Sequence, residues 1–179
     1  RRMRLVPVGR LDRDSSGLIL MTNELSMVHI LTHPSFGHEK TYRVSISGEL
    51  KSKDWQKFES GLLISGEKRP TAPCYLEPVL YDSKKKNSVV DVTLREGRNR
   101  QIRRMFDHLG YKVVNIKRTQ FGPVRLGGLS HGEWKELKHY EVKKLRNISK
   151  TKTKKPAPTN EKYDAAKKST RRGSAAAAA

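Results

Sequence analysis

One carboxylate set between arginines is the feature of this sequence that could do chemistry. Asp12 lies in the run Arg10-Leu11-Asp12-Arg13, directly before a polar turn and an apolar, strand-like segment. The chain of 179 residues carries 38 Lys and Arg against 18 Asp and Glu, a net charge of +20. Such an excess of positive charge favours a polyanionic partner. We therefore interpret Asp12 as a candidate for acting on a nucleic acid rather than for holding a metal ion.

Plainer interpretations of the acidic residues stay open at this point. An aspartate in a turn commonly accepts hydrogen bonds from backbone N–H groups, which would make Asp12 structural. Asp14 is followed by Ser15, Ser16 and Gly17, where an Asx turn accounts for it, so we assign it a structural role. The paired carboxylates of a glycosidase normally come from separate elements about 5–10 Å apart, so these two acids do not indicate that chemistry.

A basic segment at residues 96–106 supplies cations that could serve such a carboxylate. The apolar stripe of the helix expected over residues 99–109 consists of Ile102, Met105, Phe106 and Leu109. Arg103 lies at the flank of this stripe and should be half-buried, where it could pair with a carboxylate and keep it ionised. The cations better placed for phosphates are Arg98, Arg100 and Arg104. A solvated basic helix explains the same pattern equally well.

Tyr42 is a candidate for stacking on a base. It stands between Lys40 and Arg43 at the start of an alternating segment, so its ring could stack while the two cations contact an RNA backbone. A core tyrosine explains the same spacing. The six histidines show no metal-ligand spacing, and no GxGxxG or Walker motif is present. Neither a metal nor a nucleotide cofactor is therefore expected.

The segments that must position these side chains alternate between strands and helices. Short strands are expected at residues 5–8, 17–22, 40–47, 72–80, 88–94 and 112–120. Helices are expected at residues 25–31, capped by Asn23, and at residues 52–62 and 99–109. Because short links join most neighbouring strands, we predict an α+β fold, a mixed and mostly antiparallel sheet flanked by helices.

The apolar residues are concentrated in residues 1–146, which we predict to form one folded domain. Residues 147–179 hold nine basic residues with almost no aliphatic ones, which predicts a basic tail that is disordered or becomes ordered on RNA. We interpret the poly-alanine run that closes it as a segment whose residues carry no information about the fold. Because a strand-like pattern begins almost at once, we expect an N-terminal portion upstream. The apolar stretches are too short to span a membrane, and the single Cys74 excludes an internal disulfide.

Several motifs follow one another in an order that carries a family resemblance. They are Gly9-Arg10-Leu11-Asp12, Ser16-Gly17-Leu18-Ile19, Lys40-Thr41-Tyr42, Glu96-Gly97-Arg98-Asn99-Arg100-Gln101-Ile102-Arg103-Arg104 and Phe121-Gly122-Pro123. Over about residues 4–146 they resemble pseudouridine synthases of the RsuA/RluB family. That family usually has an upstream Lys-Pro-x-Gly segment and often an S4-type RNA-binding domain, which this sequence does not show. It also often has Asp-Gly where this chain has Glu24-Leu25.

The resemblance implies roles for particular residues. Asp12 would be the catalytic aspartate, Tyr42 the platform that stacks on the target base, and Arg103 the partner that holds Asp12. Contacts to RNA are expected from Arg10, Arg13, Lys40, Arg43, Arg98, Arg100, Arg104 and Leu137. Among these, Arg10 would lie beside the flipped nucleotide and Leu137 near the base.

The resemblance also implies an activity, the isomerisation of a specific uridine in ribosomal RNA to pseudouridine on a flipped-out base. No cofactor or metal is required by that family. The expected partner is ribosomal RNA or a pre-ribosomal particle, and the protein is expected to be a monomer without membrane attachment. Its expected location is a bacterial cytoplasm, or a chloroplast or mitochondrion in a eukaryote. The alternative is a non-catalytic RNA-binding or ribosome-assembly protein that retains the fold.

Overall fold

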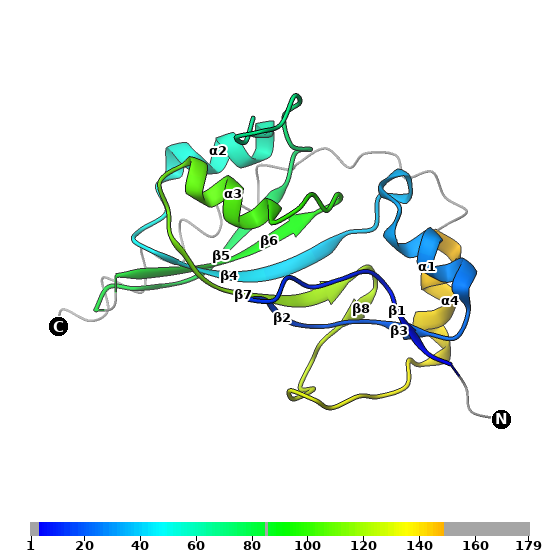
Figure 1. Cartoon of the computed structure of the whole chain (residues 1–179). Coiled ribbons are helices and arrows are strands. Elements are labelled where there is room, and N and C mark those ends of the chain that lie inside the picture. The colour runs from blue at the N-terminus through cyan, green and yellow to red at the C-terminus, as the bar shows by residue number, and fades with distance from the viewer. Residues whose placement is uncertain (1–3, 85, 149–179) are drawn as a thin grey trace.

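The computed structural model describes residues 4–84 and 86–148, and Figure 1 labels their elements. The strands are β1 (Val6–Pro7), β2 (Ser16–Gly17), β3 (Met21–Thr22), β4 (Lys40–Ser47), β5 (Tyr75–Asp82), β6 (Asn87–Leu94), β7 (Val113–Phe121) and β8 (Val124–Arg125). The helices are α1 (Leu25–Thr32), α2 (Ser52–Ser60), α3 (Gln101–His108) and α4 (His139–Ile148), with a 3-10 turn η1 at Pro34–Phe36.

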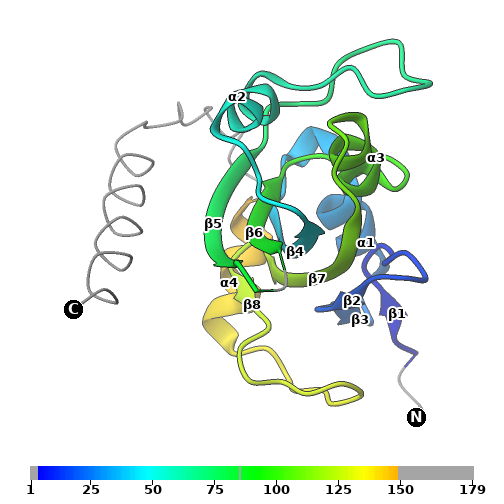
Figure 2. The ribbon, with the colours of Figure 1, turned by 90° about the vertical axis from the view of Figure 1, so that its left-hand side faces the viewer.

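The main sheet has the strand order β2-β7-β4-β6-β5, and β8 pairs with β7. Every pairing in it is antiparallel except the parallel one between β2 and β7. Strands β1 and β3 form a separate antiparallel pair. Figure 2 shows the long strands curving, with α2 and α3 on the concave side. The predicted α+β class, with a mixed and mostly antiparallel sheet, is confirmed.

The first core lies between the sheet and helices α2 and α3. Alternation along β4 buries Val44 and Ile46, as the period of two in its sequence predicts. From the helices, Phe58 and Phe106 bring their ring centroids to 4.8 Å in this core. The apolar stripe predicted for α3 is therefore confirmed. Because the stripe is buried, the helix cannot rotate, and the directions of its arginines are set.

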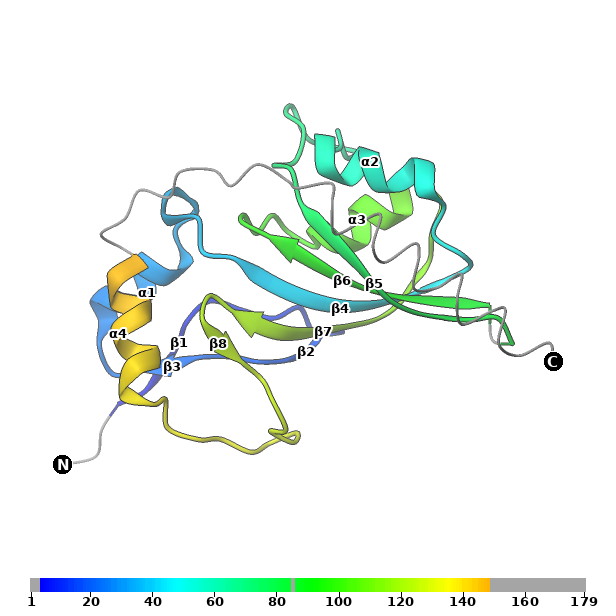
Figure 3. The same cartoon turned by 180° about the vertical axis from the view of Figure 1, so that it is seen from behind.

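The second core lies where α1 and α4 pack beside β7 and β8, at the other end of the sheet (Figures 1 and 3). Leu31 of α1, Phe121 of β7 and Leu145 of α4 are buried in it. Helix α4 was not predicted, and its last two residues, Asn147 and Ile148, are the first two of the predicted tail. The rest of the predicted tail, residues 149–179 with the poly-alanine run, lies outside the described residues.

The predicted strand over residues 17–22 is divided into β2 and β3, which belong to different sheets. Gly17 pairs with Arg118 of β7 and has φ +105°. A Cβ at Gly17 would lie 2.3 Å from the carbonyl oxygen of Arg118, so only glycine allows this approach. The chain then leaves β7 and pairs again through β3 with β1. The turn that carries Asp12 is thereby tied to the main sheet.

Helix α1 begins without the predicted cap. Glu24 is its N-cap residue and makes no side-chain cap hydrogen bond, so the prediction for Asn23 is wrong. Instead, the hydroxyl of Thr22 accepts a hydrogen bond from the backbone N–H of Glu24 at 3.0 Å. Among the described residues, none of the helices has the length and apolar character that crossing a membrane requires.

Candidate active site

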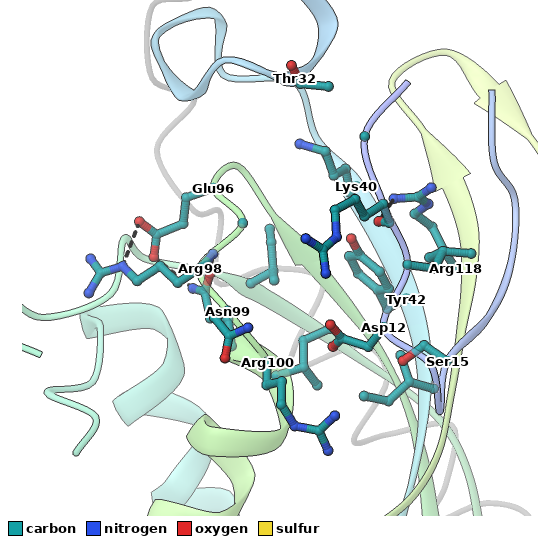
Figure 4. A pocket seen from close by; sticks show the side chains of 18 of the residues that line it. Asp12, Ser15, Thr32, Lys40, Tyr42, Glu96, Arg98, Asn99, Arg100 and Arg118 are labelled. Carbon is teal, nitrogen blue, oxygen red and sulfur yellow. Dashed lines mark hydrogen bonds and ion pairs between the residues drawn. The ribbon is translucent and has the colours of Figure 1, made fainter. Parts of the chain in front are cut away.

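A cavity of about 410 Å³ lies between residues 8–15, the start of β4, residues 94–103 and strand β7. Its volume is within the roughly 300–1,000 Å³ of typical small-molecule sites. The three residues predicted to be catalytic, Asp12, Tyr42 and Arg103, all line it. Figure 4 shows Asp12, Tyr42 and Arg100 reaching into this space from three different segments of the chain. The fold therefore brings together residues that lie up to about ninety positions apart.

Asp12 is half-buried at the start of a tight turn, in which the backbone N–H of Ser15 donates a hydrogen bond to the carbonyl of Asp12 at 3.0 Å. Its carboxylate forms no hydrogen bond and no ion pair with any described residue. The pKa of Arg100 is raised by its hydrogen bond to Asp14, by the charge of Asp14 and, to a smaller extent, by the charge of Asp12. A carboxylate that makes no hydrogen bond or ion pair in a cation-lined cavity is available to a ligand.

Tyr42 both packs against the first core and lines the cavity. It lies on β4 between Val92 of β6 and Arg118 of β7, and it is half-buried against the first core. It also lines the cavity, and Figure 4 shows its ring beside Asp12. The two interpretations of its spacing, core tyrosine and base platform, therefore do not exclude each other.

Arg103 has the most buried side chain of the four arginines in residues 96–106, but it contacts Asp14 and not Asp12. Its Nε lies 3.1 Å from the Oδ2 of Asp14, and its Nη2 donates to the backbone carbonyl of Asp14 at 2.7 Å. A longer hydrogen bond at 3.4 Å joins it to the carbonyl of Val113. The described residues therefore show no ion pair between Arg103 and Asp12, and Arg103 instead contacts Asp14, two residues further along the turn.

Arg100 completes the link between the turn and α3. Its guanidinium donates two hydrogen bonds to the carboxylate of Asp14, at 3.0 and 2.9 Å. The residue caps α3 in the left-handed conformation, with φ 47° and ψ 32°. A non-glycine residue in this region costs on the order of 1–3 kcal/mol and persists where its surroundings hold it. The bidentate ion pair with Asp14 supplies such a restraint.

Asp14 is expected to titrate below its usual pKa, because Arg100 donates hydrogen bonds to its charged form and Arg103 adds attraction. The contribution of such a group to stability is present at neutral pH and is lost as the pH falls through its depressed pKa. Carbon-detected NMR titration of the Asp14 carboxyl measures this pKa. In Arg100→Gln it should rise toward the value of an unfolded chain. The matched control is Arg43→Gln, which breaks a different bidentate pair, with Asp91. A pKa of Asp14 that is unchanged by Arg100→Gln would contradict the assignment.

Two of the arginines expected to bind phosphate are engaged within the protein. Arg98 donates to the backbone carbonyls of Arg69 and Pro70 at 2.9 and 2.6 Å. Arg104 pairs with Glu67 at 2.9 Å and also donates to the carbonyl of Ser65. Both therefore fasten the loop before β5 to the segment around α3. Of the two, only Arg98 lines the cavity.

The remaining residues predicted to contact RNA are divided between the cavity and other places. Arg10 and Lys40 line the cavity, and Arg10 is exposed at it. Arg13 is exposed but does not line the cavity. Arg43 of β4 forms an ion pair with Asp91 of the neighbouring strand β6, at 2.9 Å. Leu137 packs against the second core and does not line the cavity.

Sequence reasoning missed two residues that the structure places at this site. Asp14 was interpreted as a turn residue, yet it binds two arginines of the segment that begins α3. Arg118 is 2% exposed and still lines the cavity. The alternation of β7 places Arg118 on the same face as the buried Ile116 and places Lys117, the other cation of the strand, on the opposite face, and this was the signal that could have found Arg118. Within residues 4–84 and 86–148 there is no group of three acidic, His or Cys side chains suited to a metal ion.

Comparison with known proteins places this geometry in context. A family model described as RNA pseudouridylate synthase matches residues 1–108. Ribosomal large subunit pseudouridine synthase B of Bacillus subtilis is 39% identical over 82% of this chain and 59% of its own length. Ribosomal small subunit pseudouridine synthase A of Pasteurella multocida is 39% identical over 78% of this chain and 58% of its own length. A crystal structure of a pseudouridylate synthase matches with a TM-score of 0.72 at 39% identity, over 79% of this chain and 59% of that one.

Proposed function

The chain belongs to the RNA pseudouridylate synthase family, and we propose on that basis that it isomerises a uridine of ribosomal RNA to pseudouridine. The observation that carries the proposal is the carboxylate of Asp12, which makes no hydrogen bond or ion pair with a described residue and lies beside Tyr42 in a cation-lined cavity. The names of relatives that act on the large and small ribosomal subunits support RNA of the ribosome as the substrate class. The chain spans less than two thirds of those relatives.

The reaction exchanges one bond of the nucleotide for another. The N1–C1′ bond breaks, the uracil turns, and a bond forms between C5 and C1′, after which C5 loses its proton and N1 takes one up. Asp12 would act on the sugar, either as a nucleophile at C1′ or as a base toward a sugar proton, and both roles need its ionised form. The absence of a competing ion pair leaves that carboxylate free to approach the sugar.

The arginines of the cavity would have two roles: one would contact the nucleotide and another would hold the turn that carries Asp12. Arg10 is exposed at the cavity, where it would contact the flipped nucleotide. Arg103 would act on Asp12 indirectly, since it holds the backbone carbonyl and the side chain of Asp14 two residues further along the same turn. We therefore assign Arg103 a positioning role, exerted through the turn.

Tyr42→Leu is expected to weaken the reaction more than Tyr42→Phe, because only phenylalanine keeps a ring that can stack on the detached uracil. Stacking of a base on an aromatic side chain contributes about 1–3 kcal/mol, which corresponds to a roughly 5- to 150-fold difference between the two variants. Single-turnover rates and RNA affinities measure it. Both variants lose the hydroxyl and keep a buried apolar side chain against the first core, so each is the control of the other. Equal rates for the two variants would exclude the platform role.

The proposal is tested by release of tritium from ribosomal RNA transcribed with uridine labelled at C5. An active synthase releases the label into water as the C5 proton is lost. Mapping the product then identifies the uridine that was changed. RNA binding without release, on transcripts of both ribosomal subunits, would favour the alternative of a non-catalytic RNA-binding or ribosome-assembly protein.

A further inference from the structure

Arg118 is a buried cation without an acidic partner among the described residues. Only 2% of it is exposed, although it lines the cavity. Its Nε donates to the carbonyl of Leu18 at 2.6 Å, and its Nη1 makes a longer hydrogen bond of 3.5 Å to the carbonyl of Arg10. Its Nη2 is buried and has no hydrogen-bond partner in the described chain. A buried charge left in this state is costly, which indicates that part of its environment is completed by a ligand.

Lys40 places a second cation beside Arg118. The ring of Phe121 lies 5.2 Å from the Nζ of Lys40 and 5.6 Å from the Cζ of Arg118, measured to the ring centroid. Burial lowers the pKa of Lys40, and the charge of Arg118 lowers it further. The one hydrogen bond described for the Lys40 ammonium is a weak one of 3.4 Å to the carbonyl of His38. Figure 4 shows both cations on the side of the cavity where Tyr42 lies.

The acidic groups of this region form no ion pair with Lys40 or Arg118 in the described chain. Glu39, the neighbour of Lys40, forms an ion pair with Arg95 at 2.7 Å. Asp14 is bound to Arg100 and Arg103. Asp12 makes no ion pair with either cation in the described chain. Two adjacent cations that have no carboxylate paired with them repel each other. An anion that binds next to both of them in the cavity relieves that repulsion.

We propose that Lys40 and Arg118 form the subsite for one phosphate of the target nucleotide, with Lys40 in contact with the phosphate and Arg118 as the fixed charge behind it. This inference rests on the proposed function and adds to it a specific anchor inside the cavity. Lysine suits the contact because its ammonium is a compact charge on a flexible chain. Arg118 suits the supporting position because its hydrogen bonds to Leu18 and Arg10 hold its guanidinium in place. The same anchor orients the sugar toward Asp12.

The test compares the binding of uridine, uridine 5′-monophosphate and uridine 3′-monophosphate to the full chain, followed by NMR on the Nε–Hε signal of Arg118. One of the two phosphates is expected to bind about 10-fold or more tightly than uridine, the scale of hydrogen bonds to a charged group. The same phosphate should shift the Arg118 signal. In Lys40→Gln the affinity for that monophosphate divided by the affinity for uridine should fall close to one. Arg118→Gln is informative only where its melting curve shows a folded protein, so Lys40→Gln is the variant that decides.

Lys117→Gln is the matched control, because Lys117 is the exposed neighbour of Arg118 on β7 and its side chain projects from the other face. It removes the same charge and should leave the affinity ratio unchanged. The subsite is refuted where neither phosphate shifts the Arg118 signal up to roughly 50 mM, far above the ~1 mM Kd of a weak site. It is equally refuted where Lys117→Gln lowers the ratio as much as Lys40→Gln. The affinity ratio does not depend on turnover. A failure of tritium release would therefore contradict the proposed function but not the phosphate subsite, whereas the outcomes above would contradict the subsite alone.

Discussion

Asp12→Asn is expected to abolish the isomerisation of uridine while RNA binding is retained. The amide keeps the shape of the side chain but can neither attack the sugar nor remove a proton. The single-turnover rate should fall by roughly 10⁴-fold or more, the scale for loss of a group that the chemistry uses directly. Because Asp12 makes no ion pair or hydrogen bond through its carboxylate in the described chain, the substitution removes no contact of the fold. The melting temperature should therefore change little.

Tritium release from ribosomal RNA labelled at C5 measures the rate, and a filter-binding titration of the same RNA measures the affinity. Asp107→Asn is the control, since Asp107 is an exposed acid of α3 that does not line the cavity and its loss changes the net charge equally. It should release tritium at the rate of the unmodified chain. Measurable turnover by Asp12→Asn within about tenfold of that rate would remove Asp12 from the chemistry.

Gly17→Ala is expected to cause the largest loss of stability at the site. A Cβ at this position would lie 2.3 Å from the carbonyl oxygen and 2.6 Å from the nitrogen of Arg118, both backbone atoms of β7 that cannot turn aside. The φ of +105° is also unfavourable for alanine. Together these effects should lower the free energy of unfolding by on the order of 3–5 kcal/mol. Strand β2 would have to separate from β7, and the turn that carries Asp12 would move with it.

Urea unfolding of the two proteins measures the difference. Gly128→Ala is the matched control, because a Cβ there meets nothing within 4 Å and its φ is not in the left-handed region. Its free energy of unfolding should stay within about 0.5 kcal/mol of the unmodified protein, as for most surface substitutions. Equal midpoints for Gly17→Ala and Gly128→Ala would show that β2 adapts without cost and that its contact with Arg118 does not anchor the turn.

The elements that repeat a local period were predicted well from the sequence. Strand β4 alternates between polar and apolar residues, and its predicted bounds agree with the structure. The stripe on α3 similarly predicts which side of that helix is buried, and so the half-buried position of Arg103. Such periods are readable because each residue's exposure depends on the geometry of its own element.

The elements that depend on distant partners were predicted poorly. Helix α4 packs beside α1, β7 and β8, where its Leu145 is buried in the second core. The division of the predicted strand into β2 and β3 depends on which sheet each half meets. Contacts between segments that lie far apart in sequence leave no local pattern, so propensity and spacing do not predict them.

For the site, the sequence by itself determined which residues are available: one acid between arginines, one tyrosine on an alternating strand and a run of cations before a helix. Their ordered motifs also indicated the family, which the comparisons confirm. Only the tertiary structure decided their pairing. Asp14 rather than Asp12 receives Arg100 and Arg103, and Arg118 is buried against the turn. The reason is physical: an ion pair depends on distances and directions across the fold, and a shift of two residues in one turn exchanges the partner while the sequence stays the same.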